Sequence, residues 1–281
     1  MTTTTTTPAP PAATSAVPAG PVEVHPVNQK LVLRSEWIKL RTLRSTLIVL
    51  AVTMVAMVGI GLLIAAVTNS NFATMGADQR AHFNAIDRVL GGVNIAQLTV
   101  GVLGVLIITG EYSTGMIRAT FGAVPTRLPV LWAKLAVFAS VVFSVCVVSS
   151  FAAFLGGEAL LGTHGVSLSA PGAVRAVFGV ALYLTVASLL GVAFGFIVRN
   201  TAGGIAALFG LLLVLPGLAN LLPSSWQDSV VPYFPSNAGQ ALYTQHGDHA
   251  MMHPWAGFAL FVGYLAIAVV AAAVTLRRRD A

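Results

Sequence analysis

Long runs of hydrophobic residues dominate the pattern along this chain. Six such runs fall at about 45–67, 92–110, 132–155, 174–198, 203–222 and 255–276. Each has close to the roughly 20 residues that an α-helix needs to cross the hydrocarbon core of a bilayer. The pattern therefore predicts an all-α membrane protein with six transmembrane helices, contained in one domain over residues 29–281.

The segment just ahead of the first run, residues 29–44, alternates apolar and basic residues at helical spacing. Trp37 and several leucines share one arc of this helix, although Glu36 interrupts that arc. We expect an amphipathic helix on the cytoplasmic leaflet, with Trp37 at headgroup level and membrane lipid as its partner. A basic flank without a helix is the alternative. The residues expected at the interface are Arg34, Trp37, Lys39 and Arg41.

Composition supports a membrane location for most of the chain. Of 281 residues, 56% are hydrophobic and only 9% are charged, with a mean hydropathy of +0.85. A soluble domain carries roughly a quarter of its residues as charges. Residues 1–28 differ, since they are rich in Thr, Pro and Ala. We expect them to form a disordered cytoplasmic tail, because they bury too little apolar surface to offset the entropy of ordering.

The basic residues lie mainly at the ends of the apolar runs, where topology signals occur. With the N-terminus inside, 12 of the 15 Lys and Arg residues fall in cytoplasmic segments, and only Arg80, Arg88 and Arg175 fall outside. This bias predicts that both termini lie on the cytoplasmic side of the membrane. The net charge of +6 could suggest that the protein binds nucleic acid, but the position of the basic residues at the ends of the apolar runs argues against it.

Common catalytic signatures are missing from the sequence. There is no GxxxxGK[ST] phosphate-binding loop, no GxSxG elbow, no HExxH and no CxxC. The single cysteine, Cys146, lies within an apolar run and is expected to be a packing residue. We therefore expect neither enzymatic activity nor a bound cofactor in this chain. If ATP drives it, another polypeptide hydrolyses that ATP.

A group of histidines in the last outer loop is the one candidate for a metal site. On a helix, three of its members would line one face and satisfy tetrahedral zinc. The loop contains glycine, so a solvated polar loop is favoured and no metal site is predicted. The residues are His246, Asp248, His249 and His253.

The second apolar run is the least hydrophobic, because it contains Asn94 and Gln97. With Gly101 and Gly104, these residues are expected to form a face for close helix packing. Contact with a transported substrate is the alternative for Asn94 and Gln97.

Residues 110–134, GEYSTGMIRATFGAVPTRLPVLWAK, follow an unusual order: an acid directly after a span, then Thr-Gly, then Pro-Thr-Arg, then a lysine at the next span. This order resembles the loop between spans 2 and 3 of type-2 ABC exporter permeases, the group that includes drug and bacitracin exporters. SEWIKLRTLRS (35–45) is similar to the N-terminal elbow helix of that family, and YFPSNAGQAL (233–242) to its last outer loop.

The resemblance implies a dimer of six-span permeases, formed by two copies or two related chains, with two ABC ATPase subunits on the cytoplasmic face. It also implies a short coupling helix between spans 2 and 3, which Gly115 and Pro125 would bracket. Met116, Ile117 and Phe121 would give that helix an apolar face for the ATPase cleft. The residues matched to the ATPase-coupling loop are Glu111, Thr114, Gly115, Met116, Arg118, Phe121, Pro125, Arg127 and Lys134.

Together these patterns predict the membrane-spanning subunit of an ATP-driven exporter of amphipathic or hydrophobic molecules. An integral membrane enzyme or secondary carrier is one alternative. A membrane anchor for an ATPase that transports nothing is another.

Overall fold

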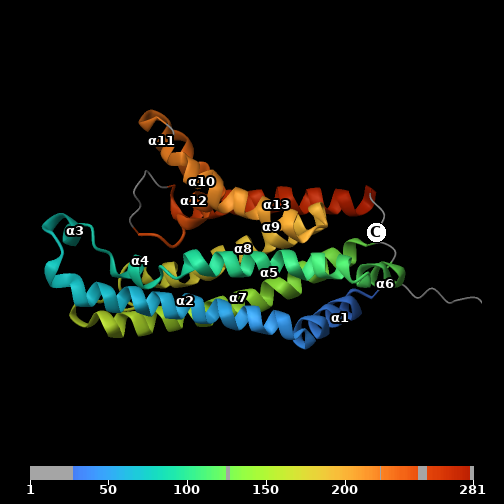
Figure 1. Cartoon of the computed structure of the whole chain (residues 1–281), viewed down its shortest axis with the longest axis horizontal. Coiled ribbons are helices and arrows are strands. Elements are labelled where there is room, and N and C mark those ends of the chain that lie inside the picture. The colour runs from blue at the N-terminus through green and yellow to red at the C-terminus, as the bar shows by residue number, and fades with distance from the viewer. Residues whose placement is uncertain (1–27, 125–126, 222, 246–251, 279–281) are drawn as a thin grey trace, which may run out of the picture.

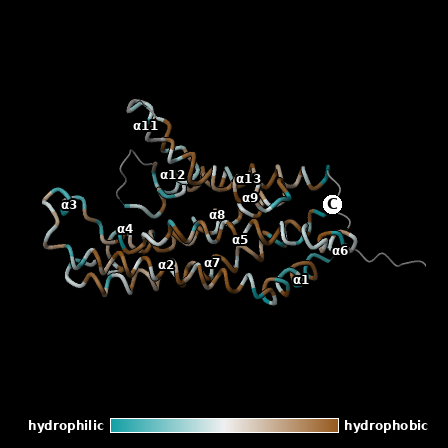
Figure 2. The backbone as a smooth tube through the Cα atoms, in the orientation of Figure 1, coloured by the Kyte–Doolittle hydropathy of each residue, from teal (hydrophilic) through white to brown (hydrophobic). Residues whose placement is uncertain are grey.

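Five long helices form the body of the protein. The computed structural model describes residues 28–124, 127–221, 223–245 and 252–278, which contain helices and no strand. Five of the helices are long and apolar enough to cross a membrane, and they match five of the six predicted runs. They lie side by side in an elongated bundle (Figure 1) and are mainly hydrophobic along their length (Figure 2). They are α2 (Arg44–Asn71), α5 (Val93–Ser113), α7 (Leu128–Leu161), α8 (Ala173–Val198) and α13 (Pro254–Arg278).

The sixth predicted run, 203–222, is helical over Thr201–Gly217, which is shorter than the five candidate spans, and it is irregular along its length. It divides into α9 (Thr201–Phe209), a π-helical turn η3 (Gly210–Val214), α10 (Leu215–Gly217) and a 3₁₀ turn η4 (Leu218–Leu221). Pro216 has no N–H, and its ring clashes with the carbonyl four residues earlier, so a regular helix cannot continue through it. The segment still runs back along the bundle in Figure 1. Six crossings therefore stay a prediction.

Shorter helices sit at the two ends of the bundle (Figure 1). One end, called here the α1–α6 end, carries α1, α6 and the last turn of α13. The other, called the α3–α4 end, carries those two helices. The short elements are α1 (Gln29–Thr42), η1 (Phe72–Thr74), α3 (Ala77–Ala81), α4 (Ala85–Val89), α6 (Met116–Ala123), η2 (Gly162–His164), α11 (Ser224–Val230), η5 (Val231–Tyr233) and α12 (Pro235–Gln240).

Helices form where the sequence predicts the elbow and the coupling helix. Asn28 caps α1, since its side chain accepts a hydrogen bond from the backbone N–H of Lys30 at 3.0 Å. Leu43 is extended and turns the chain into α2. Gly115 has a φ of 72°, a left-handed conformation that glycine adopts without strain, and it separates α5 from α6. Of the tail predicted to be disordered, residues 1–28, all but Asn28 lie outside the described residues, and Asn28 itself caps α1.

The centre of the bundle is α8, the most buried of the candidate spans, which packs on α5, α7 and α13. Close contact between α5 and α8 requires glycine on both sides. A Cβ added to Gly104 would lie 2.1 Å from the backbone oxygen of Ser188, and one added to Gly191 would lie 2.3 Å from that of Gly101. The packing face predicted for the second apolar run is thus present, at least for its glycines.

Candidate functional site

Four charged side chains meet at the α1–α6 end. Lys134, on α7, donates to Glu36 Oε2 of α1 at 2.5 Å and to Glu111 Oε1 of α5 at 2.8 Å. Lys39, also on α1, donates to Glu36 Oε1 at 2.8 Å and to Glu111 Oε1 at 3.3 Å. The two lysines and two carboxylates balance in charge. We call these four residues the charge cluster.

The charge cluster is largely removed from water. The exposed fraction of the side chain is 2% for Lys134, 3% for Glu36, 8% for Glu111 and 25% for Lys39. Burying a charge costs several kcal/mol unless it is paired and hydrogen-bonded, and removing one partner then leaves the other uncompensated. The cluster therefore holds three helices in a fixed arrangement more than it adds net stability.

Lys39 extends the charge cluster to α6. Its ammonium group also donates to Thr120 Oγ1 at 3.3 Å. Burial, the largest single influence, lowers the pKa of Lys39, but the hydrogen bond to Glu36 and the negative charges of Glu36 and Glu111 together raise it above its ordinary value. A lysine with a raised pKa stabilises the fold fully below its ordinary pKa and loses that contribution only as the pH rises through the folded-state value. Lys39 is therefore charged at neutral pH.

The inner face of α6 packs against the protein itself. Ile117 and Phe121 are 2% and 8% exposed, and the guanidinium of Arg127 lies 5.5 Å from the centre of the Phe121 ring. Arg127 Nη1 also donates to the backbone oxygen of Leu276 at 3.0 Å, which connects this corner to the end of α13. The expectation that Phe121 and Ile117 face a partner was wrong, because the chain's own bundle already covers them.

The outer face of α6 is open. Met116, Arg118, Ala119 and Gly122 are exposed, and a Cβ added to Gly122 would touch nothing within 4 Å. On a helix with 3.6 residues per turn, these four residues occupy one arc, opposite the arc of Ile117 and Phe121. We call Met116, Arg118, Ala119 and Gly122 the outer face of α6.

Several residues predicted from the loop pattern come together here, and others do not. Glu111 and Lys134 meet in the charge cluster. Thr114 is exposed and its hydroxyl donates to the backbone oxygen of Gly110 at 2.8 Å. Pro125 lies outside the described residues. Glu36 was missed as a site residue, although an acid on the apolar arc of a basic helix was a usable signal.

The four residues predicted at the interface separate into two groups. Arg34, Trp37 and Arg41 are exposed on α1. Lys39 instead turns inward to the charge cluster, which corrects its predicted place. The reason is that Lys39 lies on the same side of the helix as the buried Glu36, three residues away.

Asn94 and Gln97 do not form a joint polar site. Gln97 is 4% exposed, and its Oε1 accepts a hydrogen bond of 2.5 Å from the hydroxyl of Tyr183 on α8. Asn94 is exposed, and its Nδ2 donates to the backbone oxygen of Gly91 at 3.4 Å. Gln97 therefore links two helices.

Replacing Tyr183 with Phe is expected to lower the free energy of unfolding by about 0.5–1.5 kcal/mol, the range for a hydrogen bond between membrane helices. The measurement is denaturant-induced unfolding in detergent. Tyr264→Phe serves as the matched control, since it removes a more exposed hydrogen bond, 2.9 Å to the backbone oxygen of Tyr233. Equal losses in the free energy of unfolding for the two substitutions would show that the buried hydrogen bond contributes no more to stability than the exposed one.

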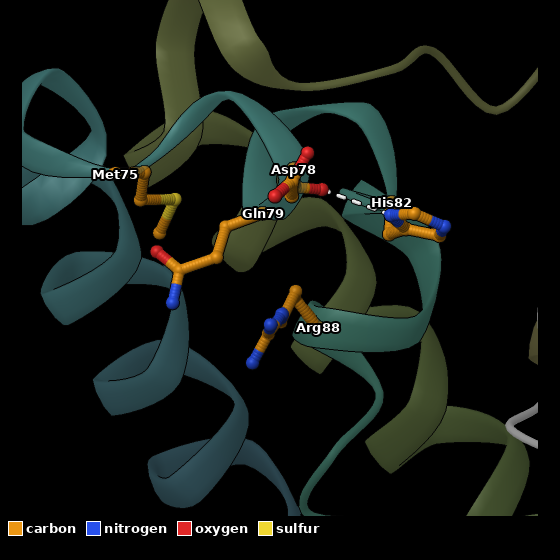
Figure 3. Close-up of a pocket in the computed structure, with 5 residues that line it drawn as sticks. All are labelled: Met75, Asp78, Gln79, His82 and Arg88. Atoms are coloured by element: carbon orange, nitrogen blue, oxygen red, sulfur yellow. Dashed lines mark hydrogen bonds between the residues drawn. The ribbon is translucent and has the colours of Figure 1, made fainter.

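A polar pocket of about 420 Å³ lies at the α3–α4 end, far from the charge cluster. Figure 3 shows Arg88 projecting from α4 beneath α3, with Gln79 and Met75 beside it. The His82 ring turns outward, and its Nδ1 lies 2.9 Å from the backbone oxygen of Asp78. An apolar groove of about 470 Å³ runs between α7, α8 and α13, lined by residues such as Trp132, Leu189 and Val262.

No cluster of His, Cys, Asp or Glu in the described ranges could hold a metal ion. Three of the four residues considered from sequence, His246, Asp248 and His249, fall in the gap at 246–251. The fourth, His253, is exposed.

A bundle of long apolar helices, with a charge cluster fixing short helices at one end, defines a multi-pass membrane protein. The model of the family described as ABC-2 family transporter protein matches residues 32–217, about two thirds of the chain. The chain belongs to this family of transporter membrane subunits. No curated protein matches it.

Proposed function

We propose that the chain is the permease subunit of an ATP-driven exporter in a bacterial cytoplasmic membrane, with both termini in the cytoplasm. One observation carries this proposal. A short helix, α6, presents an open outer face while its other side contacts α1 through Lys39 and α13 through Phe121 and Arg127, and it also packs on α5. Force applied to α6 would reach these three helices of the bundle through these contacts.

The energy for transport must come from outside this chain, because the sequence has no phosphate-binding loop. We assign hydrolysis to a separate ABC ATPase, present in two copies, and contact with it to the outer face of α6. A second copy of this chain, or a related permease, would complete the transport path.

The substrate class in this proposal is supported by the surface that the bundle offers to a substrate. The groove between α7, α8 and α13 is lined by apolar side chains, which suits an amphipathic or hydrophobic molecule. A secondary carrier would require polar groups along a path, yet Gln97 is occupied by Tyr183. That pairing makes a carrier or a membrane enzyme the weaker alternative.

The test is purification of the tagged chain from its own cells in mild detergent. We expect an ABC ATPase to co-purify, and its ATP hydrolysis to rise when hydrophobic or amphipathic compounds are added to the reconstituted complex. An ATPase that co-purifies but never responds to such compounds would indicate an anchor that transports nothing. Absence of any ATPase would contradict the proposal.

A further inference from the structure

The exposed side of α1 carries a row of positive charges. Lys30, Arg34 and Arg41 are all exposed. With 100° per residue, the three fall within about 40° of one another around the helix axis. In the described part of the chain, no ion pair involves any of them. We call these three residues the basic row.

Exposed apolar residues lie directly beside the basic row. Leu31, Trp37 and Ile38 are 62%, 48% and 50% exposed. Val32, Glu36 and Leu40 on the opposite side are buried. The helix thus uses one side to pack on the bundle and leaves an outer side that is half cationic and half apolar. A helix with such an outer side is stable where apolar side chains reach acyl chains and cations remain at the headgroups.

The apolar part of this surface continues onto the first long helix. Leu47, Ile48 and Val55 of α2 are 51%, 62% and 70% exposed, and α2 is one of the candidate membrane spans. The outer side of α1 therefore meets the same lipid phase that covers α2. An acidic protein bound to the basic row would leave this continuous apolar surface uncovered, whereas a lipid leaflet covers both parts.

We propose that the outer side of α1 binds anionic phospholipids selectively, with lipid phosphates on Lys30, Arg34 and Arg41. Selectivity follows from charge, because Glu36 is the only acid on α1 and it is buried against Lys134. The charged side chains that α1 exposes are therefore all positive. Each Lys or Arg near an anionic membrane surface strengthens the attraction about fivefold.

The bound lipids would also act on coupling, a consequence that rests on the proposed function. Glu36 and Lys39 connect α1 to α5, α6 and α7. Lipids that hold the outer side of α1 would therefore hold the short helix that we assign to the ATPase.

The test uses Trp37 as a reporter, because it is exposed and lies beside the basic row, about 20° from Lys30 around the helix axis. A variant with Trp37 as its only tryptophan, W132F/W226F/W255F, is placed in nanodiscs of phosphatidylcholine with a minor fraction of phosphatidylglycerol. In one sample the acyl chains of phosphatidylcholine are brominated, and in the other those of phosphatidylglycerol are brominated. We expect phosphatidylglycerol to quench Trp37 at least about threefold more strongly per brominated chain, and the preference to shrink at high salt.

Two further variants separate charge from structure. K30Q/R34Q/R41Q should lose the preference while Trp37 is still quenched, and R34K/R41K should keep it. Equal quenching by both lipids, no quenching by either, or a preference that survives in K30Q/R34Q/R41Q would overturn the proposal. Loss of ATPase binding in K30Q/R34Q/R41Q, with no lipid preference in the parent, would assign the basic row to a protein partner instead. The quenching needs no ATPase, so its result stands apart from that of the proposed function.

Discussion

Replacing Lys134 with Met is expected to destabilise the protein by about 3–5 kcal/mol, the cost of leaving buried charges without their partner. Lys134 donates to both carboxylates of the charge cluster and is 2% exposed. Its loss leaves Glu36 and Glu111 to share Lys39, which is partly in water. The measurement is the free energy of unfolding of the purified protein in detergent, with recovery of monodisperse protein followed in parallel.

Glu111→Gln is the matched control for this substitution. Glu111 Oε2 is buried and accepts no hydrogen bond from the described residues, so this carboxylate is the less satisfied of the two. Lys134 would still be paired with Glu36 at 2.5 Å. We expect a smaller loss than for Lys134→Met, and partial recovery in the double variant E36Q/K134M, which removes one charge of each sign. Wild-type stability in Lys134→Met would show that the charge cluster does not hold α1 in place.

Hydrophobic pattern alone was sufficient to predict the five long helices, because a run of about 20 apolar residues has few other stable structures. It did not predict the irregular turns in the sixth run. Hydropathy treats Pro216 as a tolerable residue, whereas the backbone must change to a π-helical and then a 3₁₀ turn around it. The turn at Gly115 was predictable, because the residue type itself indicates the backbone conformation. Glycine is the residue that adopts a positive φ without strain.

The candidate site was only partly predictable. Glu111, Lys39 and Lys134 were each selected, but as parts of two separate elements, because nothing in the sequence states that α1 lies beside α5 and α7. Glu36 interrupts the amphipathic pattern, and its burial against Lys134 explains why an acid stands at that position. The prediction that Phe121 faces a partner was wrong for a related reason. Helical spacing identifies an apolar face but does not indicate whether another chain or the same chain covers it.

Reversing the charge on the outer face of α6 is expected to release the ATPase. The variant M116E/R118E places two acids where the proposal puts the contact, and both positions are exposed in the chain alone. Surface substitutions change folding stability by only about 0.5 kcal/mol. Truncating a side chain at the centre of an interface, or reversing its charge, costs about 2 kcal/mol or more of binding free energy. This is a loss of roughly thirtyfold in affinity.

The control variant is R277E/R278E. Arg277 and Arg278 are exposed cations at the same end of the bundle, but they lie on α13. We expect this variant to insert, fold and bind the ATPase almost as the parent does. A general effect of negative charge at this end would instead weaken both variants equally.

The most direct test of the central claim is the amount of ATPase that co-purifies with M116E/R118E, relative to the parent and to R277E/R278E, at equal membrane insertion and equal stability. The account predicts that M116E/R118E loses at least about nine tenths of the bound ATPase, as a roughly thirtyfold drop in affinity gives when the ATPase concentration is near or below the Kd of the parent, while R277E/R278E retains it. Full retention of the ATPase by a well-inserted M116E/R118E would contradict the assignment of α6 as the coupling element.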